Sequence, residues 1–194
     1  MNRSHRKQRG VVLLIALTVL VAMSLAGVAL MRSVDNTVVI AGNVSFKQAS
    51  LMVAERGTND AWVWLNQQAT AVPPTLQDDN NGVGYYSSRP PSEPDWFDDN
   101  TWASAVTTNG GLPDSTGNTV QYLIHRMCQQ PGLQWNEGNQ SCVLYFPPAD
   151  KLDSGSKTIG TAVYQGTAQL YYRVTSRVLG PRNNVTITQT SIVQ

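Results

Sequence analysis

An uncharged run at residues 11–31 constrains this 194-residue chain more than any other feature. The run is built mainly from Val, Leu, Ile, Ala and Met, and the nearest charged residues are Arg9 and Arg32 on either side. As an α-helix, these residues would span about 31 Å, close to the roughly 30 Å hydrocarbon core of a bilayer. We therefore expect residues 11–31 to form a membrane-spanning helix.

The ten residues before this run set its orientation. They contain four Lys or Arg and no Asp or Glu, and positively charged flanks stay on the cytoplasmic side of a membrane. Residues 33–194 are therefore expected outside the cytoplasm. A removed secretory signal would have an apolar stretch of only about 7–15 residues. Ala22-Met23-Ser24 fits its cleavage rule, but the apolar run continues to Met31, so we favour retention of the helix. An uncleaved anchor remains an open alternative.

Residues 32–69 are predicted to continue as an amphipathic helix, because apolar and small side chains recur at spacings of three and four. The predicted stripe consists of Phe46, Ala49, Val53, Gly57, Ala61, Trp64 and Leu65. Trp62 and Trp64 point to different sides of such a helix, so only one of them is expected against a sheet.

The same segment carries two signals against an ideal helix. The β-branched residues 37–40 and Gly42 are poor helix formers, which predicts a bend or local melting near residues 36–43. Pro73 and Pro74 are expected to end the element.

Residues 70–194 are expected to form one globular domain outside the cytoplasm. Residues 70–117 are rich in Pro and Asn-Gly turns and are predicted to be mostly loop, with a short helix near residues 98–105. Three aromatic residues are expected to hold this loop to the body: Trp96, Phe97 and Trp102. Residues 118–194 show the alternation typical of strands, at 120–127, 141–146, 170–178 and 185–189. The predicted fold class is α+β, with a long N-terminal helix packed on an antiparallel sheet of about four strands.

Cys128 and Cys142 are the two cysteines of the chain. Outside the cytoplasm disulfides persist, so we expect the two residues to pair. A bridge closing so short a loop would stabilise the fold by roughly 3 kcal/mol in the chain-entropy model. A zinc site or a catalytic thiol is not expected, because neither cysteine has a suitable set of partner ligands nearby.

No group of residues in the sequence predicts catalysis. His125 is the one histidine outside the first ten residues, and Cys128 would point to the opposite face of the same strand. We therefore expect a structural histidine and not a catalytic base. The acidic runs 78–82 and 98–100 lack the ligand spacing of a calcium loop and are expected to form turns. The prediction is a protein without enzymatic activity, metal or cofactor.

Charge is distributed unevenly along the chain. The formal net charge is +1, and it becomes negative once the four cations of residues 1–10 are removed, which argues against a nucleic-acid binder. Residues 78–114 are mostly acidic, with Arg89 as their one cation, whereas residues 154–194 carry four cations and no acid. The cations are Lys157, Arg173, Arg177 and Arg182. Either both segments are ordinary solvated surface, or one of them meets a partner subunit of opposite charge.

The order of these parts resembles the class III signal of type IV prepilins, in which a short basic leader ends in glycine directly before the apolar helix. By this resemblance a prepilin peptidase would cut after Gly10, and Val11 would become the methylated N-terminus. The N-terminal third is similar to PilX-type minor pilins in particular. The matching elements are Arg9-Gly10, Ala16-Leu17, Leu25-Ala26-Gly27, Met31-Arg32, Ala41-Gly42-Asn43 and Ala54-Glu55. The chain departs from the general pilin pattern at Val11, where an aromatic residue is usual, and at Ile15, where a glutamate is usual.

The resemblance implies a pilin-like fold and a non-catalytic role in priming type IV pilus assembly near the filament tip, with twitching motility and adhesion as consequences. The protein would sit in the inner membrane with its C-terminus in the periplasm. Expected partners are other minor pilins, the major pilin and a PilY-type tip protein. Small residues of the apolar helix are expected to pack against neighbouring helices: Ala16, Ala22, Ala26 and Gly27. A K-like minor pseudopilin of type II secretion and a membrane-anchored periplasmic binding module remain alternatives.

Ile15 stands where pilins carry the fifth-residue carboxylate, which is held to compensate the new α-amino group of a neighbouring subunit. An isolated charge in an apolar bundle is costly, and isoleucine cannot offset it. A subunit of this kind would suit a position where it does not have to pair with the α-amino group of a preceding subunit, such as the tip of an initiating complex.

Overall fold

The computed structural model describes residues 11–70, 76–147 and 168–194. They belong to two units, which divide after Lys47. Helix α1 (Val11–Ala69) begins in the first unit and ends in the second. The helix is continuous through residues 36–43, so the prediction of local melting there was wrong. Each β-branched residue lowers helix stability by less than about 1 kcal/mol, whereas melting would leave several backbone groups without partners.

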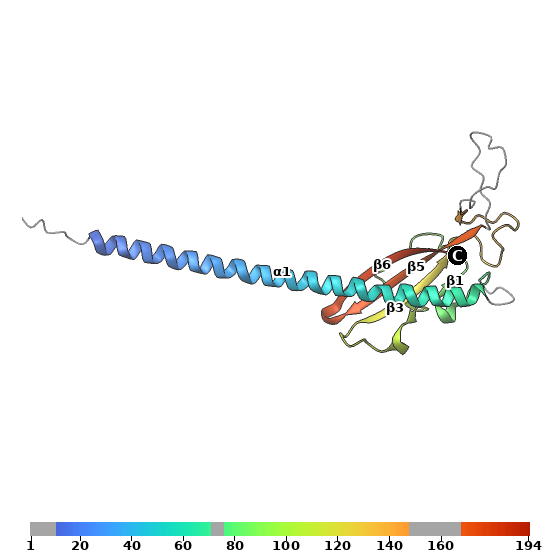
Figure 1. Cartoon of the computed structure of the whole chain (residues 1–194), viewed down its shortest axis with the longest axis horizontal. Coiled ribbons are helices and arrows are strands. Elements are labelled where there is room, and N and C mark those ends of the chain that lie inside the picture. The colour runs from blue at the N-terminus through green and yellow to red at the C-terminus, as the bar shows by residue number, and fades with distance from the viewer. Residues whose placement is uncertain (1–10, 71–75, 148–167) are drawn as a thin grey trace, which may run out of the picture. The chain divides into compact units, whose positions relative to one another are not determined.

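The second unit is an α+β fold built on a mixed sheet, and strands β1, β3, β5 and β6 are labelled in Figure 1. The strands are β1 (Tyr85–Tyr86), β2 (Val106–Thr107), β3 (Thr119–Arg126), β4 (Leu144–Tyr145), β5 (Gln169–Gly180) and β6 (Asn184–Val193). Strand β5 is central, because it pairs antiparallel with β3 on one side and with β6 on the other. Strand β4 pairs antiparallel with the start of β5. The four predicted strands are thereby confirmed.

Two very short strands were missed by the sequence prediction. Strand β2 adds antiparallel to β3, and β1 adds parallel to β3, so the sheet is not purely antiparallel. A two-residue strand contains no alternation to detect. Both strands come from the segment 76–117, which is otherwise loop with short 3₁₀ turns at Asn81–Val83, Asp99–Trp102 and Asn109–Gly111. The predicted short helix near residues 98–105 is one of these turns.

The later turns of α1 lie across one face of the sheet (Figure 1). The helix residues buried there are Ser50, Ala54, Gly57, Ala61 and Leu65. The predicted stripe was correct from Val53 onward, since Val53 is partly buried against the core. It was wrong at Phe46 and Ala49, which are exposed, and the buried row begins at Ser50. Trp64 packs beside Tyr85, with ring centroids 5.1 Å apart, while Trp62 is half exposed. One tryptophan of the pair therefore faces the sheet, as predicted.

The sheet face under the helix carries the apolar core. Its main cluster joins Ala61 and Leu65 of the helix to residues of β1, β3 and β5, which include Tyr85, Ile124 and Val174. A second cluster joins Ala54 to Val120 and Val178. Both clusters depend on small helix residues, because only these let the helix backbone approach the strands closely.

Gly57 is the tightest of these contacts. A Cβ at this position would lie 2.8 Å from Ser176 Oγ and 3.1 Å from Val120 Cγ1. We expect Gly57→Leu to lower the free energy of unfolding by about 1–3 kcal/mol, because the helix would have to move off the sheet. Denaturant unfolding of the full chain in detergent measures this change. Gly42→Leu is the matched control, since a Cβ there meets no atom within 4 Å, and an equal loss in both variants would contradict the packing argument.

Candidate functional site

The first candidate site is the exposed apolar surface of α1 in the first unit. Every large apolar side chain from Val11 to Met31 is exposed, and the most apolar 18-residue window of the helix has a mean hydropathy of 2.8. By length and composition this helix can cross a membrane once. The feature is consistent with a single membrane span or a signal anchor. Gly10, the predicted cleavage position, lies outside the described residues, and Val11 begins the described helix.

The predicted packing residues share one side of this helix. At about 100° per residue they fall within an arc of roughly 140°: Ala16, Ala22, Ala26 and Gly27. All four are exposed, and a Cβ built at Gly27 would meet no atom within 4 Å. Ile15 lies in the same arc, because its angle around the helix axis falls between those of Ala22 and Ala26. Within the described chain, then, nothing covers this side and nothing requires a glycine there.

Two hydroxyl groups lie in the same apolar stretch, and both are satisfied locally. Thr18 Oγ1 donates to the Ile15 carbonyl at 2.8 Å, and Ser24 Oγ donates to the Leu20 carbonyl at 2.8 Å. Back-bonding of this kind removes the penalty of placing an unpaired hydroxyl in an apolar medium.

A cluster of charged and aromatic residues covers the other face of the sheet. Arg173 Nη1 donates to Glu93 Oε2 at 2.9 Å, and Arg177 Nη1 donates to Asp99 Oδ1 at 2.6 Å. Trp96 donates its indole N–H to Glu93 at 2.6 Å, and this bond, with a smaller contribution from Arg173, lowers the pKa of Glu93. Two acids of the segment 78–114 and two cations of the segment 154–194 therefore pair within one chain.

The same cluster explains why β5 is buried on both faces. Arg177 lies over the Trp102 ring, 4.7 Å from its centroid, and also donates to Gln121 Oε1 from Nε and Nη2. Trp102 is buried, as predicted, and Trp96 is half-buried, but Phe97 is 77% exposed. Its backbone N–H is held in a turn by Asp95 Oδ1, which leaves its ring outside the cluster. The side chain of Arg182 is not among those described.

His125 belongs to this cluster and not to a catalytic arrangement of the kind considered above. Its ring stacks on Tyr86 with centroids 4.9 Å apart and meets the edge of Trp96 at 6.2 Å. Burial lowers its pKa from 6.5 to about 4, and the Arg173 charge adds to this effect. Cys128 is in a disulfide. Within the described ranges, no group of three or more His, Cys, Asp or Glu is placed to hold a metal ion.

The acidic runs form turns, as predicted. Asp79 Oδ1 accepts from the backbone N–H and the hydroxyl of Ser87, each at 2.7 Å. Asp98 caps the 3₁₀ turn that follows it by accepting from the Asn100 backbone N–H.

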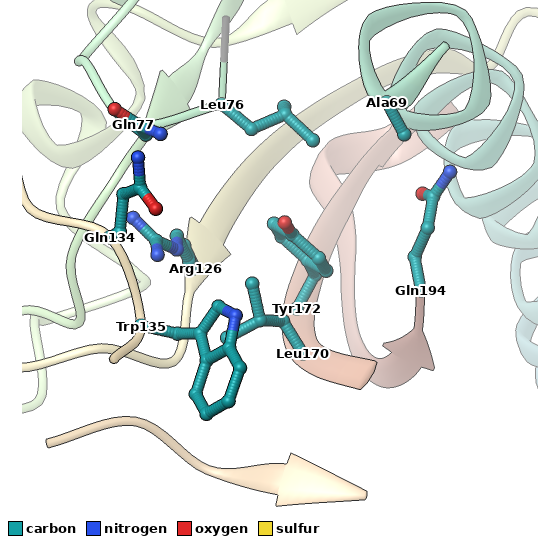
Figure 2. A pocket seen from close by; sticks show the side chains of 9 residues that line it. All are labelled: Ala69, Leu76, Gln77, Arg126, Gln134, Trp135, Leu170, Tyr172 and Gln194. Carbon is teal, nitrogen blue, oxygen red and sulfur yellow. The ribbon is translucent and has the colours of Figure 1, made fainter. Parts of the chain in front are cut away.

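A second candidate site is a cavity of about 240 Å³ at the end of the sheet, seen in Figure 2. Its walls come from the end of α1, the segment 76–77, β3, the loop that follows β3, β5 and the residue after β6; they include Leu76, Leu170, Tyr172 and Trp135. Arg126 stands at one wall although it is only 2% exposed. Sequence reasoning missed this site. The available signal was a charged residue that continues the inward row Tyr122 and Ile124 of an otherwise apolar strand.

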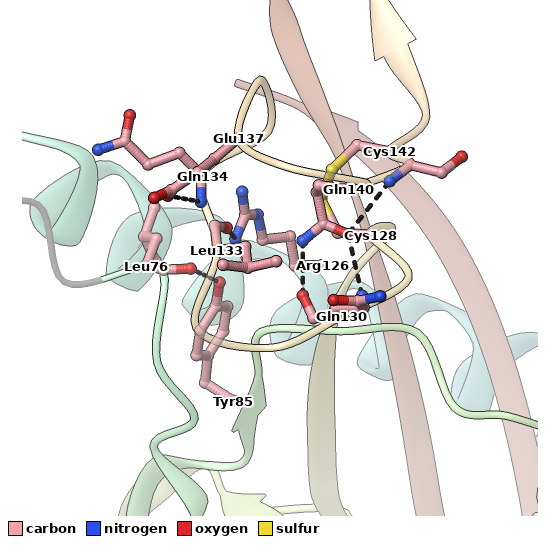
Figure 3. Close-up of a disulfide and its surroundings, with 11 residues drawn as sticks. Leu76, Tyr85, Arg126, Cys128, Gln130, Leu133, Gln134, Glu137, Gln140 and Cys142 are labelled. Atoms are coloured by element: carbon pink, nitrogen blue, oxygen red, sulfur yellow. Dashed lines mark hydrogen bonds between the residues drawn. A yellow bond between two sulfur atoms is a disulfide. The ribbon is translucent and has the colours of Figure 1, made fainter.

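The disulfide holds the loop that carries part of this cavity (Figure 3). Cys128 and Cys142 are bonded, as predicted, and they enclose Trp135, which lines the cavity, and Leu133, whose carbonyl accepts from Arg126 Nη1 at 2.9 Å. Inside the same loop, Gln140 Nε2 donates to the Gln130 carbonyl at 2.6 Å, and Gln140 Oε1 accepts from the Gln130 N–H at 3.0 Å. The cavity wall is thus held by covalent and hydrogen bonds.

No known family model matches the chain, and no curated protein or solved structure matches it either. The architecture itself is pilin-like: an apolar N-terminal helix whose later turns pack on a mixed sheet with one disulfide.

Proposed function

We propose that this chain is a minor subunit of a type IV pilus, anchored in the inner membrane and active in priming filament assembly. The observation that supports the proposal is the difference between the two parts of α1. Its first turns expose an uninterrupted apolar surface, and its later turns are packed on a sheet. A helix of this kind can dock laterally with similar helices in lipid while its domain stays outside the membrane.

The small residues of the apolar arc support docking between helices. Glycine within a helix costs about 1 kcal/mol relative to alanine, and nothing in the described chain approaches Gly27. Close packing of another helix at this position would explain the glycine, since small residues let helix backbones approach in a bilayer. The partners on this face would be other minor pilins and the major pilin, and a PilY-type protein would meet the complex at the tip.

Ile15 supports a position at the tip. It lies on the same arc as the small residues, where pilins carry a carboxylate that pairs with the α-amino group of a neighbouring subunit. Without that carboxylate, repeated stacking would leave a charge unpaired in an apolar bundle. A subunit that starts a filament avoids this cost. The same argument would place a K-like minor pseudopilin at the tip of a type II secretion filament.

The first test is the mature N-terminus. Mass spectrometry of the protein from cells with the prepilin peptidase should give a chain that begins at methylated Val11, and cells without the peptidase should retain residues 1–10. A chain that begins at Met1 in both strains would instead support a plain membrane-anchored binding module.

The second test is lateral docking. A photo-crosslinking residue at Ala26, inside the small-residue arc, should capture other pilin subunits in living cells. The same probe at Val28 is the matched control, because this position lies at similar depth and about 160° around the helix. Equal yields at both positions, or capture of no pilin subunit at Ala26, would contradict the proposal.

A further inference from the structure

Among the described residues, the cavity of Figure 2 holds a buried positive charge without a matching negative one. Arg126 is 2% exposed. Its Nη1 donates to the Leu133 carbonyl, but its Nε is buried and has no hydrogen-bond partner. Among the described residues no carboxylate forms an ion pair with it. A buried guanidinium that lacks an anion is strongly unfavourable, and a carboxylate or a similar anion is the group that its planar set of donors matches best.

A second unsatisfied group lies across the same cavity. Gln194 donates from Nε2 to Asn66 Oδ1 at 3.0 Å, which leaves its Oε1 buried and without a partner. A buried amide oxygen of this kind calls for a hydrogen-bond donor. The two open positions together describe a ligand with an anionic acceptor at one end and a donor, such as a hydroxyl, at the other.

The remaining walls suit a compact carbon skeleton. Leu76 and Leu170 are apolar, and Trp135 presents an indole that is about one third exposed. The volume of about 240 Å³ lies below the roughly 300–1,000 Å³ of pockets for drug-sized ligands. The occupant is therefore expected to be small, of about one ring, with C–H groups that can rest on the indole face.

We propose that this cavity binds a small hydroxylated carboxylate, of the class represented by an acidic monosaccharide such as a uronic acid. The carboxylate binds Arg126 through charge-assisted hydrogen bonds, a hydroxyl donates to Gln194 Oε1, and the ring packs on Trp135. The site lies wholly within residues 69–194, so it does not depend on what the apolar helix docks with.

Calorimetric titration of the full chain in detergent tests this proposal, with glucuronate as the probe and glucose as its neutral analogue. Glucuronate should bind at least about tenfold more tightly than glucose, since a charge-assisted contact in a buried site is worth at least that factor. Equal affinities for the two sugars, or no heat of binding with glucuronate at tens of millimolar, would overturn the proposal.

Three substitutions locate the site. Arg126→Gln should abolish the preference for glucuronate over glucose. Because that residue is buried and its replacement can unfold the chain, Gln194→Leu and Trp135→Ala provide the decisive readings at less buried positions, and each should weaken glucuronate binding at least about fivefold. Arg89→Gln removes an exposed arginine and should leave the affinity unchanged. Unaltered affinity in both Gln194→Leu and Trp135→Ala, or a loss in Arg89→Gln equal to theirs, would place the binding elsewhere.

Discussion

Replacing both Cys128 and Cys142 with serine should lower the free energy of unfolding by about 3 kcal/mol. The two residues are 14 positions apart, and cross-linking a loop of this size removes about that much loop-closure entropy from the unfolded chain. Denaturant unfolding of the full chain in detergent, followed by tryptophan fluorescence, measures the difference. Reduction of the unmodified protein should give a change of similar size.

The loop also carries Trp135 and the Leu133 carbonyl, so the serine variant should bind glucuronate more weakly as well. Gln140→Ala is the control that separates covalent closure from the hydrogen bonds inside the loop. It removes the two contacts with Gln130 and keeps the bridge, and its loss is expected to be about 1–2 kcal/mol. If the serine variant loses no more stability than Gln140→Ala, the bridge contributes little beyond those contacts.

The second large effect is a loss of stability as the pH falls from 6.5 to 4. Burial holds the pKa of His125 at about 4, whereas the unfolded chain has the ordinary value of 6.5. Below pH 6.5 the unfolded state binds a proton that the folded state does not, so folding becomes less favourable until the pH reaches the folded pKa. The shift corresponds to about 3 kcal/mol over that window. Unfolding free energies measured at pH 7 and pH 4 give the comparison.

His125→Phe is the matched variant for this effect. Phenylalanine can keep the stack on Tyr86, cannot bind a proton, and removes the buried Nδ1 that has no hydrogen-bond partner. The variant should therefore be as stable as the original chain at pH 7 and more stable at pH 4. Glu93 titrates with a lowered pKa, so its contribution is lost at lower pH, as its carboxylate becomes protonated. An unchanged pH dependence in His125→Phe would show that other groups cause the loss.

The parts of the fold with a long local pattern could be predicted from the sequence. The apolar run, the stripe from Val53 to Leu65, the alternation of β3 and β5, and the pairing of the two cysteines each follow from period, composition or the expected compartment. The stripe failed at Phe46 and Ala49 because helical spacing predicts a shared face and not the point at which a helix meets its sheet. Helical continuity through residues 36–43 was missed because weak propensities were given too much weight.

The features that depend on distant contacts could not be predicted. Arg173 and Arg177 are far in sequence from Glu93 and Asp99, and only the folded chain brings the acidic loop over the basic strand. Arg126 looks like an ordinary strand residue until the end of α1, the disulfide loop and Gln194 close around it. That no described carboxylate pairs with it is a property of the assembled walls, and no local spacing encodes it.

The back-bonded hydroxyls of Thr18 and Ser24 affect how the apolar helix can change its surroundings. Since each hydroxyl already donates to a carbonyl of its own helix, a neighbouring molecule does not have to supply a hydrogen-bond acceptor. Acyl chains and protein side chains can then replace one another along the helix without any hydrogen bond being broken. At these two positions a transfer of the helix between lipid and protein surroundings would therefore leave the side-chain hydrogen bonds intact.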